Sequence, residues 1–335
     1  MKTDISINRT GTDNLLSPRF IFTIFIPTYN RGTDVAKTIQ SVEKSYFRNF
    51  EVIIVDDGSN DRTYLVVAEE RKKNNFPLTY VFQKNCGKAG AHNTALQYAR
   101  GEFFMNLDAG DLLLPDAMSK FFEEWESIPV AERPLFAGVS ALCLSEDGTL
   151  SGEEYPDGIH NISYLELDAN APISGEKRQA IRTTILRQFP YPRFPGEKHV
   201  RPDLILRRMA HQYKLRLMNR PVQINIREPD GITANITRYR MENPKSFRLF
   251  YLEEITLNRK YYDNGKLYGD NWRYIRFSFH SGIKLGDQIK EVHDRLLWAV
   301  SIPQGTIKWL IDRYRMRGRK YRISFFPWKI YLPRG

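Results

Sequence analysis

Residues 20–27 have the sequence FIFTIFIP, a nearly continuous apolar and β-branched run that ends at a proline. A run of this kind predicts a short buried strand. A second buried strand is predicted at residues 51–55, EVIIV, where a turn cluster follows. Between the two, Val35, Ile39 and Val42 have the spacing of an amphipathic helix. A strand, a helix and a second strand form the unit of a parallel sheet, so this stretch decides the fold class.

The same alternation continues to residue 125. Further strands are predicted at residues 78–82 and 103–107, and further helices at 61–73, 88–100 and 115–125. This order predicts an α/β fold with a Rossmann-like, mostly parallel sheet and helices on both faces. The later pattern predicts short strands at 135–150, a short helix near 180–188, a helix at 203–212, strands at 214–218 and 222–226, and helices from Pro244 onward.

The composition of the 335 residues is that of an ordinary folded protein, with 41% hydrophobic and 27% charged residues. It excludes a disordered and a collagen-like chain, and no apolar stretch is long enough for a spanning helix. Cys86 and Cys143 are too few for a disulfide framework, which favours a reducing compartment. The net charge of +11 is uneven, because residues 301–335 carry nine Lys or Arg and one acid. The basic character therefore belongs to one segment.

Polar segments follow each of the first four predicted strands, at residues 28–31, 56–60, 84–88 and 108–111. Ligands of open α/β sheets bind at the carboxyl ends of the strands, so these segments should share one crevice. The chain has neither the G-x-G-x-x-G of dinucleotide folds after the first strand nor a G-x-x-x-x-G-K-[ST] loop. Aspartates end two strands instead. Beside a phosphate they need a divalent cation, although aspartates also cap helices or make turns.

The order and spacing of these segments resemble the family 2 glycosyltransferases, which have the GT-A fold. The resemblance rests on FTIFIPTYNR at residues 22–31, FEVIIVDDGSNDRT at 50–63 and NCGKAGAHNTALQYARGEFFMNLDAGDLLLPDAM at 85–118. Looser similarity continues in SGEKRQAIRTTIL at residues 174–186, FPGEKHVRPDLILRRMAHQYKLRLMN at 194–219 and NPKSFRLFYLEE at 243–254. The resemblance thus covers residues 20–260.

The resemblance implies a base pocket at the ends of the first two strands. Thr28 and Tyr29 would line it, with the Tyr29 ring available to stack, and Asn30 belongs to the same segment. Asp57, or its neighbour Asp56, would accept a hydrogen bond from uracil or another base. The expected donor is therefore a nucleotide-diphosphate sugar, with UDP as the first choice.

The resemblance also implies a diphosphate site after the third and fourth strands. The residues expected there are Lys84 and Lys88 near the diphosphate, Asn93 close to the ribose, and Asp108 at the ribose or a metal. The family usually has D-x-D-D, whereas this chain has Asp-Ala-Gly-Asp at 108–111. Asp108 and Asp111 are therefore the expected ligands of Mn²⁺ or Mg²⁺, in place of the acid lost at Gly110.

An inverting transferase needs a carboxylate that takes the proton from the acceptor hydroxyl. Aligning the family's acid-bearing helix with residues 203–212 puts Pro202 at the position of that base. Asp203 is the adjacent carboxylate and the first candidate, and Glu197 is the second. A helix cap or first-turn acid is an equal interpretation of Asp203.

The carboxy-terminal segment, residues 296–335, combines aromatic and aliphatic residues with a run of arginines. This combination favours an anionic membrane surface, while a nucleic-acid patch or a partner-binding tail would carry the same charges. The expected location is cytoplasmic, peripheral on the inner face of the cell membrane, with no nucleic-acid partner.

The resemblance implies a metal-dependent inverting glycosyltransferase that moves a sugar onto a glycan or lipid-linked acceptor in surface polysaccharide biosynthesis. The expected parts are a polar segment at residues 1–19, a nucleotide-sugar-binding half at 20–130, an acceptor-side half at 131–243 and a helical basic extension at 244–335. Gly110 and Pro202 keep one alternative open, a nucleotide-sugar-binding or scaffold protein with impaired catalysis. A nucleotidyltransferase is a third interpretation.

Overall fold

The computed structural model describes residues 19–227 and 236–325. In this part of the chain nine strands form one sheet: β1 Phe20–Thr28, β2 Phe50–Asp56, β3 Leu78–Phe82, β4 Gly101–Asn106, β5 Leu112–Leu113, β6 Phe136–Ser145, β7 Asn161–Ile162, β8 Lys177–Arg182 and β9 Lys214–Asn225. The helices of this α/β half are α1 Gly32–Glu43, α2 Thr63–Lys73, α3 Gly87–Tyr98, α4 Ala117–Glu126, α5 Tyr164–Asn170, α6 Thr183–Leu186 and α7 Leu204–Met209. A helical half follows, with α8 Ile236–Glu242, α9 Pro244–Ile255, α10 Asn264–His280, α11 Leu285–Glu291 and α12 Arg295–Phe325.

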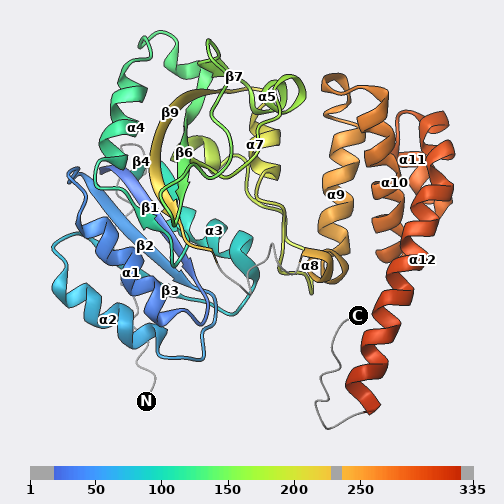
Figure 1. Cartoon of the computed structure of the whole chain (residues 1–335), viewed down its shortest axis with the longest axis horizontal. Helices are drawn as coiled ribbons and strands as arrows, with labels where there is room; N and C mark the ends of the chain where they lie inside the picture. The colour runs from blue at the N-terminus through green and yellow to red at the C-terminus, as the bar shows by residue number, and fades with distance from the viewer. Residues whose placement is uncertain (1–18, 228–235, 326–335) are drawn as a thin grey trace.

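The strand order in the sheet is β3-β2-β1-β4-β8-β6-β9-β5, and β7 pairs with β9. Strands β3, β2, β1 and β4 are parallel (Figure 1). Strand β8 runs antiparallel between β4 and β6. Ile24 of β1 lies opposite Val52 of β2 and Met105 of β4. The predicted α/β fold with a mostly parallel sheet is therefore confirmed, and the carboxyl ends of β1, β2 and β4 lie at one edge.

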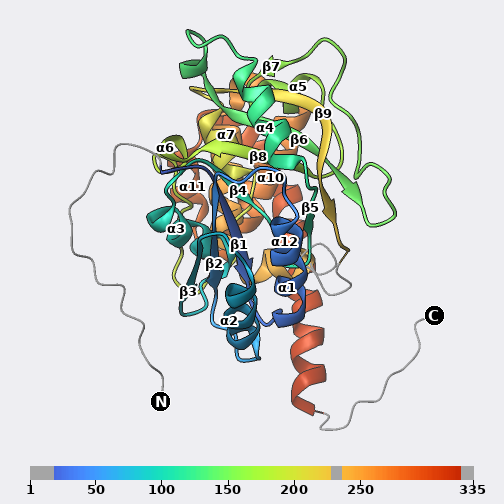
Figure 2. The same ribbon diagram turned by 90° about the vertical axis from the view of Figure 1, so that its left-hand side faces the viewer.

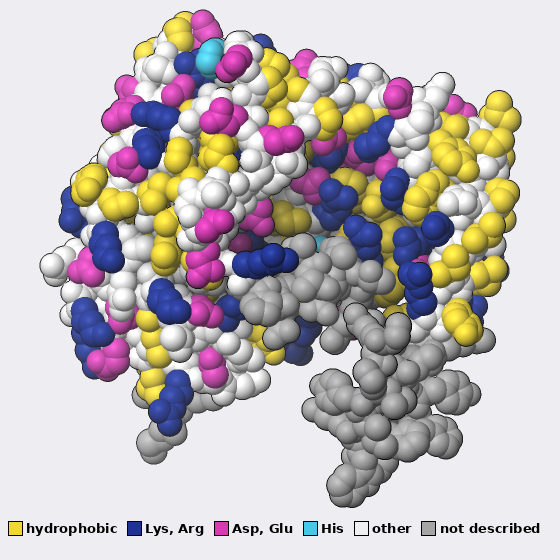
Figure 3. Space-filling view, viewed as in Figure 1, with side chains coloured by type: hydrophobic (Ala, Val, Ile, Leu, Met, Phe, Trp, Pro, Cys, Tyr) yellow, Lys and Arg dark blue, Asp and Glu magenta, His cyan; other side chains and the backbone are white. Residues whose placement is uncertain are grey.

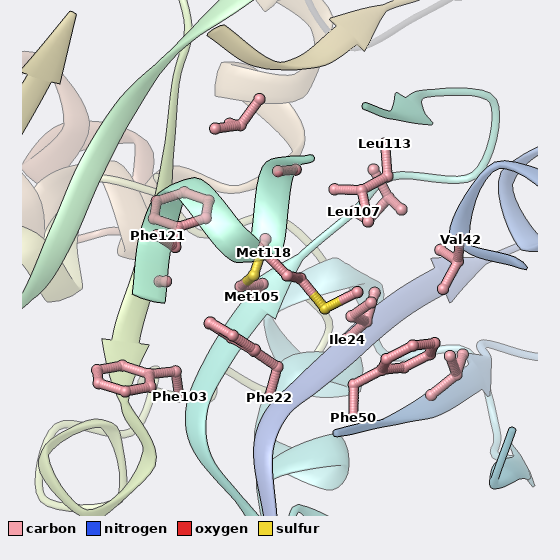
Figure 4. Close-up of a cluster of buried hydrophobic side chains, with 14 of the residues drawn as sticks. Phe22, Ile24, Val42, Phe50, Phe103, Met105, Leu107, Leu113, Met118 and Phe121 are labelled. Carbon is pink, nitrogen blue, oxygen red and sulfur yellow. The ribbon is translucent and has the colours of Figure 1, made fainter. Parts of the chain in front are cut away.

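Helices cover both faces of the sheet because successive side chains of each strand point to opposite faces. Ile24 packs in the core under α1, α2 and α4, while the next residue, Phe25, packs in the core under α3, α6 and α7. Figure 4 shows the first core, in which Phe22 and Phe50 lie on neighbouring strands. Burying a side chain of this size stabilises the fold by about 1.5–3 kcal/mol, so the two cores hold the strand ends in place.

Three predictions differ from the structure. The short strands expected at 135–150 are one ten-residue strand, β6. The helix expected near residues 180–188 is wrong in its first part, because residues 177–182 form β8 and only Thr183–Leu186 are helical. Pairing with β4 and β6 on either side overrides the local pattern there. The two strands expected at 214–218 and 222–226 are one strand, β9, whose register against β6 shifts where Leu142 lies opposite Pro221.

The helical half has a core of its own. Phe247 of α9, Tyr274 of α10 and Trp298 of α12 pack in it together with Leu204 of α7. The helical extension therefore docks on the α/β half through α7, and α12 extends beyond its neighbours (Figure 2). Among the residues described, we find no helix with the length and apolarity needed to cross a membrane. The boundaries at residues 130 and 243 stay a prediction, and residues 1–18 and 326–335 of the expected terminal segments lie outside the described part.

Candidate functional site

The ends of β1 and β2 are joined through Asp57, whose backbone N–H donates to the carbonyl of Thr28 at 2.9 Å. The Asp57 carboxylate accepts hydrogen bonds from the backbone N–H groups of Cys86 at 2.9 Å and Gly87 at 2.7 Å. Its Oδ1 also accepts from Gln83 Nε2 at 2.7 Å. Asp57 is buried and holds the segment between β3 and α3 against the sheet. The base-binding role expected for it stays a prediction.

Asp56 holds the turn after β2. Its Oδ1 accepts from the backbone N–H of Ser59 at 2.7 Å, and its Oδ2 accepts from the Tyr80 hydroxyl at 2.6 Å. Burial and the hydrogen bond to Asp56 raise the pKa of the Tyr80 phenol. Asp56 is buried and both of its carboxylate oxygens accept hydrogen bonds within the protein, so its observed role is to hold the turn.

Thr28 is the residue of the predicted base pocket with a buried polar group available to a ligand. Its Oγ1 is buried and has no hydrogen-bond partner among the described residues. The next residue, Tyr29, is 46% exposed, so its ring is accessible for stacking. Asn30 has a left-handed φ of 53°, and its Oδ1 accepts from the Asn60 N–H at 2.7 Å. A cavity of about 410 Å³, lined by residues 30–34, 61, 62 and 66, adjoins this segment.

The diphosphate side of the site is formed by Lys88 at the start of α3 and Asp108 after β4. The Nζ of Lys88 lies 2.6 Å from the Asp108 carboxylate, and both side chains are partly exposed. Burial alone would raise the pKa of Asp108, but the positive charges of Lys88 and Arg178 outweigh it and lower the pKa. The structure thus brings Lys88 and Asp108 together as predicted. Lys84 lies on the same segment and is exposed.

Asp111 lies beside Asp108 and completes an acid pair. Its two oxygens accept from Gln223 Nε2 at 2.7 Å and from the Ile226 N–H at 3.0 Å. Burial and the charge of Asp108 together raise the pKa of Asp111 to about 6. Two neighbouring carboxylates, one of which raises the pKa of the other, fit a divalent cation. Water and phosphate oxygens would be its other ligands.

Gly110 occupies the turn between the two acids for a conformational reason. Its φ is 111°, which strains any residue with a Cβ, and its N–H donates to Thr38 Oγ1 at 2.8 Å. The backbone closes at this point through the Asp111 N–H, which donates to the Asp108 carbonyl at 3.0 Å. A third carboxylate at position 110 would be strained in this turn, so the described residues offer two acids to a metal ion.

Arg178 is a charged residue of the site that sequence reasoning did not single out. It projects from β8, is 8% exposed, and its Nη2 lies 3.7 Å from Asp111 Oδ2. Its Nε is buried without a hydrogen-bond partner among the described residues. The segment 174–186 carried a family resemblance, but nothing in its pattern indicated that Arg178 faces the acid pair.

Asn93 has a structural contact in place of a free amide. Its Nδ2 donates to the Tyr191 carbonyl at 2.8 Å, and its Oδ1 accepts from the Tyr191 N–H at 3.0 Å. Burial raises the pKa of the Tyr191 phenol, and the negative charges of Asp203 and Asp108 raise it further. The Tyr191 hydroxyl donates to the Pro202 carbonyl at 2.8 Å, next to the predicted catalytic base, a contact that the sequence did not indicate.

Asp203 is held by two arginines at the start of α7. Arg201 donates to both of its oxygens, at 3.0 and 2.8 Å, and Arg207 Nε donates to Oδ2 at 3.1 Å. Burial opposes ionisation, but these guanidinium groups prevail and lower the pKa of Asp203. Arg207 also binds Glu254 of α9 at 3.0 Å, so the carboxylate is tied to the helical half.

Glu197 caps α9. Its two oxygens accept from the backbone N–H groups of Lys245 and Ser246, each at 2.8 Å. Burial raises the pKa of this carboxyl. Since a helix N-terminus favours a negative charge, Glu197 stabilises the junction between the two halves. The catalytic role predicted for Asp203 or Glu197 stays a prediction.

Residues 23–131 match the family described as Glycosyl transferase family 2. They are a glycosyl transferase family 2 domain. This match contains Thr28, Asp57, Lys88 and the acid pair, which the geometry brings to one edge of the sheet.

Curated relatives are similar to part of the chain. A UDP-Glc:alpha-D-GlcNAc-diphosphoundecaprenol beta-1,3-glucosyltransferase of Escherichia coli is 35% identical over 99 residues, covering 30% of this chain and 38% of the relative. A GalNAc(5)-diNAcBac-PP-undecaprenol beta-1,3-glucosyltransferase of Campylobacter jejuni is 30% identical over 168 residues, covering 49% of this chain and 52% of the relative. The chain therefore spans about half or less of the length of these two glycosyltransferases.

Solved structures extend the likeness to the whole fold. Staphylococcus aureus TarS superposes with a TM-score of 0.55 at 19% identity, covering 92% of this chain and 93% of that one. TarS in complex with UDP-GlcNAc superposes with a TM-score of 0.52 at 17% identity, covering 85% of this chain and 80% of that one. A Pyrobaculum calidifontis mannosyltransferase in complex with GDP-Man and Mn²⁺ superposes with a TM-score of 0.51 at 18% identity, covering 90% of this chain and 83% of that one. At these identities the likeness shows the GT-A fold alone.

Proposed function

We propose that this chain transfers a sugar, with inversion, from a UDP-sugar to a glycan or lipid-linked acceptor in surface polysaccharide biosynthesis. Residues 20–130 would bind the donor and residues 131–243 the acceptor. The observation that carries the proposal is the meeting of Thr28, Lys88 and Asp108 at the carboxyl edge of the sheet. The unsatisfied Thr28 hydroxyl suits a base, the Lys88 ammonium suits a diphosphate, and the acid pair suits a metal ion.

A divalent cation, Mn²⁺ or Mg²⁺, would be held by Asp108 and Asp111. When bound, such an ion neutralises charge on a departing diphosphate. Lys88 would share that role, since its ammonium already pairs with Asp108 at 2.6 Å and can turn to a phosphate oxygen. Support for the metal comes from the repulsion within the acid pair and from the Mn²⁺ in the mannosyltransferase of the same fold.

We propose Asp203 as the group that takes the proton from the acceptor hydroxyl. Asp203 stays ionised at neutral pH, because Arg201 and Arg207 lower its pKa. Tyr191 is influenced by both Asp203 and Asp108, which supports a location near the donor site. Glu197 is the second choice, since both of its oxygens are engaged by the backbone of α9.

The membrane part of the proposal rests on α12. Its exposed apolar side chains recur at helical spacing along one side of the helix: Leu296, Val300, Ile307, Leu310 and Tyr314. Asp312, the one acid of α12, is buried and paired with Arg276 and His280. An apolar stripe beside exposed arginines suits the interface of an anionic bilayer, which supports peripheral attachment through residues 296–335 at the cytoplasmic side.

The direct test is release of UDP from UDP-sugars in the presence of Mn²⁺ and an undecaprenyl-diphosphate-linked sugar. The chain should release UDP only when donor and acceptor are both present. Asp108→Ala should abolish the release and keep the circular-dichroism spectrum of the native protein. Full turnover by this variant would remove the metal assignment.

A second candidate function is a nucleotide-sugar-binding or scaffold protein with impaired catalysis. Gly110 and the double arginine pairing of Asp203 favour it, because both weaken groups that catalysis needs. Calorimetry would detect UDP binding under either proposal. Binding of UDP without turnover of any donor in the presence of acceptors would support the second.

A further inference from the structure

A group of basic side chains lies next to the donor site, two on the segment that covers the start of α3 and two in helices α8 and α9. We define the basic cluster as Arg193, Lys198, Arg240 and Lys245. Arg193, Lys198 and Lys245 are exposed, and Arg240 is half-buried. Figure 3 shows Lys and Arg side chains gathered on this face where the helical half borders the α/β half.

Close contacts hold this segment against α3. A Cβ at Gly87 would lie 1.6 Å from the carbonyl oxygen of Lys198, so only glycine allows the approach. The Nη2 of Arg193 lies 3.4 Å from Cys86 Sγ, and Cys86 is the residue whose N–H binds Asp57. Two members of the basic cluster therefore lie beside the loop that carries the donor-site residues.

The other two members belong to the helical half and are brought to the same place. Asn243 Oδ1, at the α8–α9 corner, accepts from the backbone N–H of Lys198 at 2.7 Å and of His199 at 2.8 Å. Glu197, on the same segment, caps α9 at Lys245. The His199 ring lies 5.6 Å from the Phe247 ring, over which Arg240 also lies. The basic cluster thus spans both halves.

The positive charge of the basic cluster is offset in part, by the Coulomb attraction between Lys245 and Glu197. Within the described ranges, no carboxylate forms a salt bridge with Arg193, Lys198, Arg240 or Lys245, whereas Arg201 in the same region pairs with Asp203. The Nε of Arg240 is buried without a hydrogen-bond partner in the described part. Burial and the charges of Arg201, Lys88 and Arg240 lower the pKa of His199 to about 4. The basic cluster is therefore an electropositive patch that both halves of the described chain contribute to.

We propose that the basic cluster binds a phosphate group of the acceptor, so that the acceptor class is a phosphorylated one. The inference rests on the proposed function and deepens it, since a phosphate would supply the negative charge that a neutral glycan lacks. Arginine and lysine together suit phosphate, because guanidinium donates in a fork and ammonium acts as a point charge. The phosphate could belong to a prenyl-linked diphosphate or to a polyol phosphate.

The experiment uses the full chain saturated with UDP and Mn²⁺, so that the donor site is filled. Farnesyl diphosphate represents the prenyl source and glycerol 3-phosphate the polyol source, and each is titrated by calorimetry. The test variant is the double change Lys198→Ala and Lys245→Ala, at exposed positions outside the donor site. The matched control is Lys72→Ala with Lys290→Ala, which removes two exposed lysines elsewhere.

The native protein and the control should bind at least one of the two probes. The test variant should lose at least about tenfold in affinity for it, since each hydrogen bond to a charged group is worth about this factor. The affinity for UDP with Mn²⁺ should stay within twofold in all three proteins. The probe that binds more tightly identifies the source of the phosphate.

Equal affinity of the test variant and the native protein for both probes would overturn the inference. So would competition in which UDP with Mn²⁺ displaces the probe, because the basic cluster would then serve the donor. A native protein that binds UDP but neither probe contradicts this inference and leaves the proposed function standing. Failure to bind UDP at all would contradict the proposed function itself.

Discussion

Replacing Asp111 by asparagine removes one negative charge from the acid pair and keeps the size of the side chain. Asp111 is 8% exposed and accepts hydrogen bonds from Gln223 and Ile226. Asparagine can accept from the Ile226 N–H in the same way. Gln223 can turn its amide toward the new Nδ2, because its own Oε1 is buried without a partner in the described part. The substitution therefore tests charge more than packing.

The size of the effect follows from the pKa of Asp111. Burial and the charge of Asp108 raise this pKa from 3.8 to about 6. Between these values the folded protein keeps a proton that the unfolded chain has lost, so the free energy of unfolding falls as the pH rises. A shift of about two units corresponds to a loss of about 3 kcal/mol above pH 6. Asp111→Asn should recover most of that loss.

The assay is urea unfolding of the native protein and Asp111→Asn in EDTA, at pH values below 4, between 4 and 6, and above 7. The two proteins should have similar stability at the lowest pH. At the highest pH the variant should be more stable by up to about 3 kcal/mol. Added Mn²⁺ should stabilise the native protein, because the ion binds only the folded state, and should stabilise the variant much less.

An exposed aspartate supplies the control. Asp157→Asn, at an exposed position, should leave the pH dependence of unfolding unchanged. If Asp111→Asn destabilised the protein equally at every pH, Asp111 would act through its hydrogen bonds and the charge argument would be refuted. If Mn²⁺ stabilised Asp111→Asn as much as the native protein, Asp111 would not hold the ion.

Three further changes separate binding, docking and membrane attachment. Thr28→Val removes an unsatisfied buried hydroxyl, so the free energy of unfolding should stay the same or rise by about 1 kcal/mol. Calorimetry should show weaker UDP binding, and unchanged affinity would remove Thr28 from the base pocket. Arg207→Met breaks the buried ion pair between α7 and α9 and should lower the free energy of unfolding in urea by about 3–5 kcal/mol. Arg208 is more exposed, so a larger loss of stability in Arg208→Met than in Arg207→Met would contradict this prediction. Leu310→Glu should reduce cosedimentation with phosphatidylglycerol vesicles, whereas Leu257→Glu, exposed outside the α12 stripe, should not; equal binding by both would argue against attachment through α12.

The first half of the fold was predictable because its signals are local. The strand β1 buries residues 22–26 of its apolar run, and β3 begins and ends at the residues predicted, 78 and 82. Residues 177–182 were not predictable in this way. Their alternating burial as β8 depends on β4 and β6, which are distant in sequence.

The candidate site was predictable in part. The pairing of Lys88 with Asp108 follows from the strand-end rule, since both residues lie at the carboxyl edge of the sheet. The sequence could not indicate that Asn93 binds the backbone of Tyr191 or that Glu197 caps α9, because those partners lie 98 and 48 residues away. Asn93 and Glu197 therefore have protein contacts that sequence spacing does not reveal.

The sequence alone determined that the chain forms a parallel α/β layer with polar residues at its carboxyl edge, because periodic burial and strand order are properties of neighbouring residues. The tertiary structure decided which charges meet there. Arg178 from β8 faces Asp111, and Arg207 ties Asp203 to the helical half, through contacts between segments far apart in the chain. Such contacts depend on how layers pack, and electrostatic interactions act over a few ångströms in space whatever the separation along the chain.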